Sequence, residues 1–174
     1  MIKGGKGGAK TLTGLKFEKR VDIRTLLKKL KGYKIKDHDV YFEGKITAQI
    51  YQKHDFYKKF LEPQGVDWTK ILSTRLLPDQ VIFILTSKTL YVVEMKFQNV
   101  PGSVDEKLQT CNFKKEQYAK LVEPLNIKIE YVYILSDWFN TERYRDSLNY
   151  VKEVGCHYFF NELPLSFLGL PLPK

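Results

Sequence analysis

Two short runs of β-branched and aromatic residues lie close together near the middle of the 174-residue chain. The first run covers residues 81–85 (VIFIL), the second covers residues 90–93 (LYVV), and the intervening Thr-Ser-Lys-Thr favours a turn. Runs of this length and composition, separated by so few residues, predict a β-hairpin. A hairpin at this place restricts the chain to folds that contain a β-sheet.

Charged residues flank the predicted hairpin at both ends. Pro78-Asp79 precedes the first strand, and Glu94-Met95-Lys96 follows the second. Pro78 is compatible with the entry to a strand, where it need not donate a ladder hydrogen bond. Because side chains alternate along a strand, we expect Glu94 and Lys96 to share one face, which carries the chemistry, while Met95 lies on the other, apolar face. Pairing within the hairpin can then bring Asp79 close to Glu94.

Neighbouring carboxylates repel each other unless a cation neutralises them. Mg²⁺ suits this arrangement, because it uses one or two protein carboxylates and leaves its other positions to water and substrate phosphate. We expect Asp79, Glu94 and the backbone carbonyl of Met95 to bind the metal. Lys96 would activate the attacking water and stabilise charge on the phosphoryl oxygens. The set favours phosphodiester hydrolysis; the alternative is an exposed Glu94–Lys96 ion pair beside a Pro-Asp turn.

The pattern of an acidic residue, any residue and then lysine also occurs elsewhere in the chain. Glu43-Gly44-Lys45 is predicted to form a turn between two strands, and Asp105-Glu106-Lys107 to lie in the first turn of a helix. Pro-Asp, in contrast, occurs once. Only the copy at residues 94–96 therefore has both the hairpin and a Pro-Asp pair beside it.

Pro78-Asp79, Glu94-x-Lys96 and the segment 102–108 (GSVDEKL) together resemble the catalytic core of PD-(D/E)XK nucleases, specifically small type II restriction endonucleases. The resemblance spans roughly residues 4–170, and its specific part is residues 78–110. It implies an α/β fold with a mixed central β-sheet flanked by helices, and a Mg²⁺-dependent endonuclease that cuts double-stranded DNA at a short specific site. Glu18 lies in an opening similar to the first helix of the family, where a glutamate can assist the metal.

Composition is consistent with one nuclease domain over residues 14–174, preceded by a flexible Gly/Lys-rich arm at residues 1–13. Lys and Arg number 29 against 20 Asp and Glu, and the net charge of +9 favours a polyanionic partner such as DNA. We expect no membrane partner and a cytoplasmic location, because long apolar segments and a secretory signal are absent from the sequence. Cys111 and Cys156 lack metal-ligand spacing and are predicted to be reduced thiols.

The rest of the chain alternates between helical and extended patterns. Helices are predicted over residues 14–30, 52–61, 103–121 and 141–151, an antiparallel excursion over 33–51, and strands over 127–135 and 156–160. The Leu- and Pro-containing tail at residues 163–173 is expected to cover an apolar surface.

Further candidates extend the predicted site. Lys107 and Gln109, on the helix expected after Ser103, are secondary site candidates. The candidates for DNA contact are Lys6, Lys10, Lys53, Arg75 and Lys114. Cutting both strands of a short duplex site predicts a homodimer with two-fold symmetry. The alternatives are a structure-specific repair or junction-resolving nuclease of the same fold, a non-catalytic basic nucleic-acid-binding protein, and an interaction module without nucleic acid.

Overall fold

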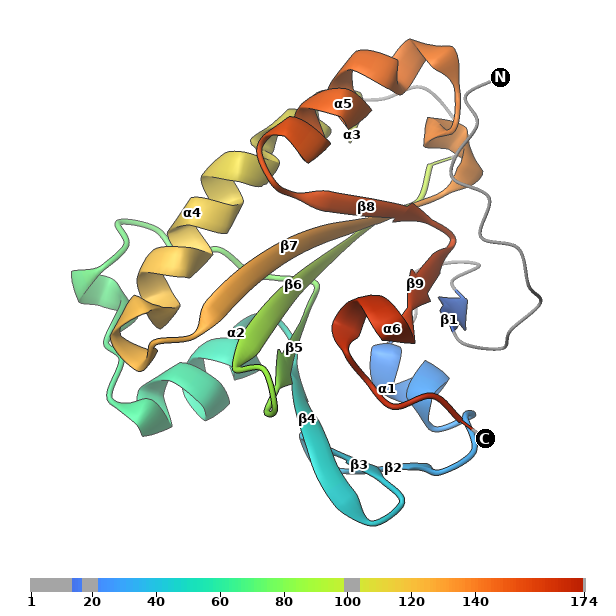
Figure 1. The fold of residues 1–174 in the computed structure, drawn as a ribbon. Coiled ribbons are helices and arrows are strands. Elements are labelled where there is room, and N and C mark those ends of the chain that lie inside the picture. The colour runs from blue at the N-terminus through green and yellow to red at the C-terminus, as the bar shows by residue number, and fades with distance from the viewer. Residues whose placement is uncertain (1–13, 17–21, 99–103, 174) are drawn as a thin grey trace.

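A seven-stranded sheet forms the centre of the computed structural model, which describes residues 14–16, 22–98 and 104–173 (Figure 1). Neighbours from β2 to β6 are antiparallel, whereas β6–β7 and β7–β8 are parallel. In spatial order the strands are β2 (Tyr33–Lys36), β3 (Asp39–Phe42), β4 (Lys45–Tyr51), β5 (Gln80–Ile84), β6 (Thr89–Lys96), β7 (Lys128–Leu135) and β8 (His157–Phe160). The prediction of a mixed α/β fold is confirmed.

The predicted antiparallel excursion is part of this sheet. Strands β3 and β4 are joined by Glu43 and Gly44, whose φ angles of 47° and 82° are both positive. Two-residue hairpin turns with positive φ at both positions match the twist of the flanking strands. The second acidic-x-lysine copy, Glu43-Gly44-Lys45, is therefore at a hairpin turn, as predicted.

The predicted hairpin is formed by β5 and β6. Val81 lies opposite Val92, and Ile82 lies opposite Tyr91. Val92 packs into the apolar cluster on one face of the sheet, while Tyr91 packs into the cluster on the other. The predicted alternation is confirmed, but apolar clusters cover both faces, so every residue of β6 is buried.

Helices cover the face of the sheet that includes Val92 (Figure 1). The predicted helix at residues 52–61 combines a short α-helix with a π-helical turn, Phe56–Leu61. The helix predicted from Ser103 is interrupted by a 3₁₀ turn, Leu108–Thr110, and Ser103 lies outside the described residues. The α-helices on this side of the sheet are α2 (Lys53–Asp55), α3 (Val104–Lys107), α4 (Cys111–Val122) and α5 (Arg145–Glu153).

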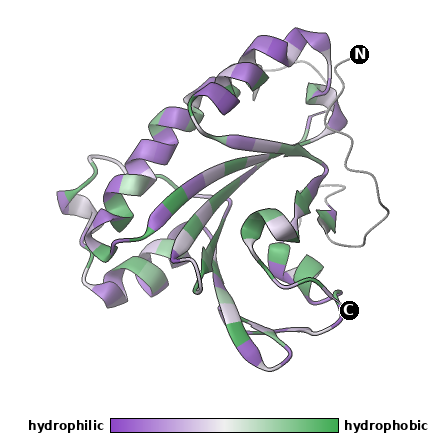
Figure 2. Ribbon diagram, viewed as in Figure 1, coloured by the Kyte–Doolittle hydropathy of each residue, from purple (hydrophilic) through white to green (hydrophobic). Residues whose placement is uncertain are grey.

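The opposite face is covered by α1 (Ile23–Leu27), α6 (Leu165–Leu168) and a two-stranded sheet of β1 (Gly14–Lys16) and β9 (Glu162–Pro164). Figure 2 shows α6 as largely hydrophobic, and Leu163, Leu165 and Leu168 pack into the cluster on this face, which agrees with the predicted covering role of the tail. The helix predicted over residues 14–30 was wrong at its start and is confirmed only for Ile23–Leu27. Leu15 pairs with Leu163 in β1–β9, and α1 starts only after its N-cap, Asp22.

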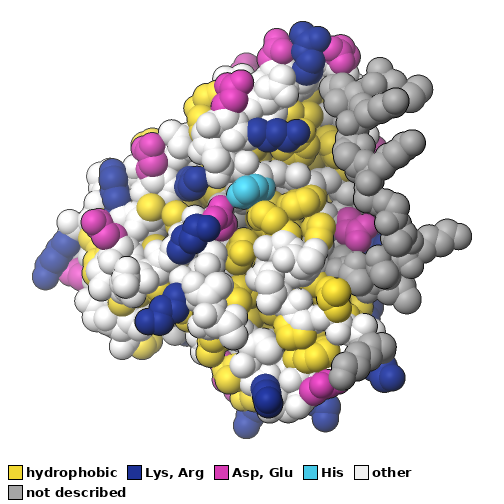
Figure 3. All heavy atoms as spheres, viewed as in Figure 1, with side chains coloured by type: hydrophobic (Ala, Val, Ile, Leu, Met, Phe, Trp, Pro, Cys, Tyr) yellow, Lys and Arg dark blue, Asp and Glu magenta, His cyan; other side chains and the backbone are white. Residues whose placement is uncertain are grey.

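Basic side chains do not form a single patch on the face seen in Figure 3. Lys and Arg are scattered there among acidic groups, and hydrophobic side chains gather over the region of α6. Within the described ranges, no helix combines the length and the apolar character needed to cross a membrane. The predicted arm at residues 1–13 lies outside those ranges.

Candidate active site

Asp79 lies at the end of the loop before β5, and hydrogen bonds fix the residues on either side of it. The Pro78 carbonyl accepts a hydrogen bond from the Lys53 backbone N–H at 3.0 Å, and the Gln80 side-chain oxygen accepts one from the Ile23 N–H at 2.7 Å. These bonds attach α2 and α1 to the residues on either side of Asp79. Asp79, which directly precedes β5, is therefore held in place through the contacts of its two neighbours with α2 and α1.

Asp79 reaches the second strand of the hairpin, as predicted. Its Oδ2 atom accepts a hydrogen bond from the Met95 backbone N–H at 2.9 Å. In an extended strand the N–H and C=O of one residue point to the same side. The Met95 carbonyl is therefore directed towards the side occupied by Asp79, and not towards β7.

Glu94 is buried, with 4% of its surface exposed. Its Oε2 atom accepts hydrogen bonds from Lys96 Nζ at 2.8 Å and from Lys114 Nζ at 3.3 Å. A carboxylate taken out of water requires such compensation, because an unpaired buried charge is very costly. The alternative of an exposed Glu94–Lys96 pair is wrong, since Lys96 is only 8% exposed.

Lys114 completes a cluster with Glu94 and Lys96. The sequence predicted this lysine only as a candidate for DNA contact. It lies on α4, three residues after Cys111 and four before Tyr118, and both of those side chains are buried. Residues at this spacing share one face of a helix. The inward orientation of Lys114 could therefore have been predicted from its place on the same helix face as two buried residues.

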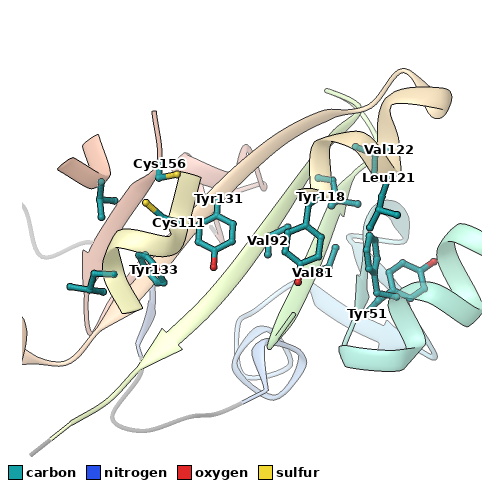
Figure 4. Close-up of a cluster of buried hydrophobic side chains, with 14 of the residues drawn as sticks. Tyr51, Val81, Val92, Cys111, Tyr118, Leu121, Val122, Tyr131, Tyr133 and Cys156 are labelled. Carbon is teal, nitrogen blue, oxygen red and sulfur yellow. The ribbon is translucent and has the colours of Figure 1, made fainter. Parts of the chain in front are cut away.

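Buried tyrosines line the cluster on the side of α4 and β7. Figure 4 shows Tyr118 projecting from α4, and Tyr131 and Tyr133 from β7. Burial raises the pKa of all three hydroxyls well above the usual range, and the negative charge of Glu94 raises each further. Asp79 also contributes to the raised pKa of Tyr118. Both carboxylates therefore lie near the Tyr118 hydroxyl, in surroundings of low polarity.

The donor set at this place consists of hard oxygen atoms. Asp79 and Glu94 supply two carboxylates, and the Met95 backbone supplies a carbonyl on the same side as Asp79. Two carboxylates are the number that Mg²⁺ commonly takes from a protein. Among the described residues there is no group of three or more His, Cys, Asp or Glu side chains arranged for a metal. Glu18, the additional ligand implied by the resemblance, lies outside those residues.

The other candidates are distributed around the molecule. The Lys107 carbonyl accepts a hydrogen bond from the Tyr133 hydroxyl at 3.1 Å, while the Lys107 side chain is exposed. Gln109 lines a cavity of about 490 Å³ next to Tyr150 of α5. The Arg75 guanidinium lies 5.2 Å from the centre of the Trp68 ring, a cation–π contact.

Two further DNA-contact candidates fall outside the described part of the chain. These are Lys6 and Lys10. Lys53, in contrast, is exposed at the start of α2, directly beside the Pro78 loop. Of the five candidates for DNA contact, Lys114 contacts Glu94 directly, Lys53 lies beside the loop that leads to Asp79, and Arg75 lies within that loop.

The comparisons with known proteins do not assign a family to the chain. The resemblance to PD-(D/E)XK nucleases rests on Pro78-Asp79, Glu94-x-Lys96 and the segment 102–108. No protein-family model, no curated protein sequence and no solved structure matches the chain.

Proposed function

We propose that the chain is a Mg²⁺-dependent endonuclease that hydrolyses phosphodiester bonds of double-stranded DNA at a short specific site, as type II restriction endonucleases do. The observation that carries the proposal is the convergence of Asp79 and Glu94 with the ammonium groups of Lys96 and Lys114. A solely structural ion pair would need one ammonium group for Glu94. The second ammonium and second carboxylate instead give a site with both metal-binding and phosphate-binding groups.

Each residue has a definite role in this proposal. Asp79, Glu94 and the Met95 carbonyl would hold Mg²⁺, which when bound supplies Lewis-acid polarisation of the phosphate and lowers the pKa of water. Lys96 would orient the attacking water and donate hydrogen bonds to the phosphoryl oxygens, on which negative charge increases in the transition state. Lys114, with its side chain 26% exposed, would contact the phosphate from the helix side.

The proposal extends to partners and location. The net charge of +9 supports a polyanionic substrate. Cleavage of both strands of a symmetric site calls for two copies of the centre, so we propose a homodimer in the cytoplasm. A repair or junction-resolving nuclease would use the same residues and would differ in the DNA structure that it recognises.

A non-catalytic DNA-binding protein is the second candidate. The observation that favours it is that only two carboxylates meet at the site among the described residues. In such a protein Lys96 and Lys114 would serve to neutralise Glu94. This candidate predicts DNA binding without cleavage at any concentration of Mg²⁺.

Cleavage of plasmid DNA distinguishes the two candidates. The wild-type protein should cut in Mg²⁺ and leave the plasmid intact in chelator. Asp79→Ala, Glu94→Ala and Lys96→Ala should each reduce cleavage by at least about 100-fold, the scale of a lost transition-state contact, while DNA binding in a gel-shift assay largely survives. Lys45→Ala, in the exposed acidic-x-lysine copy of the β3–β4 turn, is the matched control and should cut normally. Undiminished cleavage by all three site variants would refute the assignment.

A further inference from the structure

The two cysteines, far apart in the sequence, meet in the fold. Cys111 is the first residue of α4, and Cys156 directly precedes β8. Both are buried, and no disulfide joins them. Figure 4 shows their sulfur atoms close together in the space between α4 and the strands. The side chains are hydrogen-bonded to each other, so the two sulfur atoms are in contact.

The two thiols differ in pKa because their surroundings differ. The hydrogen bond from Cys156 lowers the pKa of Cys111, and the backbone N–H groups of Cys111 and Asn112 and the charge of Lys115 lower it further, against the effect of burial. The same hydrogen bond, together with burial, raises the pKa of Cys156. A thiolate is the nucleophilic form of cysteine. The backbone N–H groups at the start of α4 favour the Cys111 thiolate, so Cys111 is assigned as the nucleophile of the pair.

An exposed turn directly precedes the buried Cys156. Gly155, which precedes Cys156, is exposed and has a φ of 69°, a left-handed conformation that closes the turn after α5. Lys115 Nζ donates a hydrogen bond to the Gly155 carbonyl at 2.7 Å. The same ammonium thus holds the turn over the cysteines and stabilises a Cys111 thiolate.

We propose that Cys111 and Cys156 are a site of reversible oxidation that reacts with hydrogen peroxide and forms an intramolecular disulfide. The Cys111 sulfur attacks one peroxide oxygen, the S–O bond forms, the O–O bond breaks, and the departing hydroxide leaves as water after protonation. Cys156 then attacks the Cys111 sulfur, the S–S bond forms, the S–O bond breaks, and a second water leaves with the thiol proton. Two thiols are oxidised and one peroxide is reduced to two molecules of water.

The disulfide would join the start of α4 to the start of β8. Helix α4 also carries Lys114, one turn further on, whose ammonium contacts Glu94. Oxidation would therefore attach the first turn of α4, which carries Lys114, to the start of β8. Because the bond closes a long loop, it restricts the unfolded chain, and we expect the melting temperature to rise by about 5 to 10 °C.

Intact-mass measurement of the folded, wild-type protein after treatment with hydrogen peroxide tests the proposal without reference to nuclease activity. The expected result is a loss of about 2 Da, the mass of two hydrogen atoms, reversed by dithiothreitol, with a peptide pair linked through Cys111 and Cys156. Cys156→Ser should instead gain about 16 Da at Cys111, the mass of one oxygen in a sulfenic acid.

Lys115→Gln should slow the oxidation several-fold, because the thiolate loses its neighbouring cation. Lys120→Gln, an exposed lysine on the same helix, is the matched control and should leave the rate unchanged. An unchanged wild-type mass, gain of oxygen without a cross-link, or a disulfide between two chains would each overturn the proposal.

Discussion

Glu94 is the residue on which the electrostatics of the site depend, because its buried carboxylate is held by two ammonium groups on the same oxygen. Removal of one partner from a buried pair leaves an uncompensated charge and is strongly destabilising. Here Lys114 can compensate when Lys96 is lost, and Lys96 when Lys114 is lost. In the proposed nuclease, this redundancy would allow one ammonium to leave Glu94 for a substrate phosphate when a metal ion neutralises the carboxylate.

Lys114→Gln should therefore tighten Mg²⁺ binding. A positive charge that competes with the metal for Glu94 is removed, and we expect the dissociation constant to fall about fivefold, or about 1 kcal/mol. Titration calorimetry in the absence of DNA measures this directly. Lys120→Gln serves as the control on the same helix. Unchanged or weaker Mg²⁺ binding in Lys114→Gln would show that the lysine and the metal do not share Glu94.

A partly buried carboxylate, Glu130 on β7, links stability to pH. Burial alone would raise its pKa, but hydrogen bonds from Lys128 and His157 outweigh burial and hold the pKa below the usual 4.5. A lowered folded-state pKa adds stability above the unfolded value, and this stability is lost as the pH falls through the folded value. Glu130→Gln should therefore be less stable than wild type in urea unfolding at about pH 7, with the difference largely gone near about pH 3. A difference that does not change with pH would contradict this account.

Among the secondary-structure elements, those fixed by local patterns were predictable and those fixed by distant pairing were not. The β5–β6 hairpin follows from two short runs and a turn, and it places Asp79 beside the residues around Glu94. Residues 14–16, in contrast, become a strand because Leu15 meets Leu163 from the other end of the chain. The inward orientation of Lys114 follows from its spacing on α4, but its contact with Glu94 depends on how α4 packs on the sheet.

The C-terminal helix α6 should contribute substantially to stability, because it covers one face of the sheet. Leu168 is fully buried there, and Leu→Ala at such positions costs about 2 to 5 kcal/mol from lost burial and the cavity that remains. Urea unfolding of Leu168→Ala measures the loss. Leu172→Ala, at a side chain that is 47% exposed, is the control and should change stability by less than about 0.5 kcal/mol. Equal effects of the two substitutions would mean that α6 does not cover the sheet as described.

The whole molecule combines a sheet covered on both faces with a net charge of +9. If phosphates are the partner, the logarithm of the DNA association constant must fall linearly with the logarithm of salt concentration, because binding releases counterions. Fluorescence anisotropy with a labelled duplex gives the slope. Lys53→Gln, beside the Pro78 loop, should reduce the magnitude of this slope by about 1, which corresponds to the loss of one phosphate contact. Lys45→Gln, at the β3–β4 turn, should leave the slope unchanged. Failure to bind DNA even at low salt would favour an interaction module without nucleic acid.

Sequencing of the fragment ends is the most direct test of the claim that Asp79, Glu94 and Lys96 form a metal-dependent centre for DNA hydrolysis. Purified protein, with its fold checked by circular dichroism, is incubated with DNA of known sequence in Mg²⁺ or in chelator. We expect discrete ends that share one short, two-fold symmetric sequence in Mg²⁺, no new ends in chelator, and no new ends from Glu94→Ala. Intact DNA in Mg²⁺, or the same ends from Glu94→Ala as from wild type, would contradict the claim.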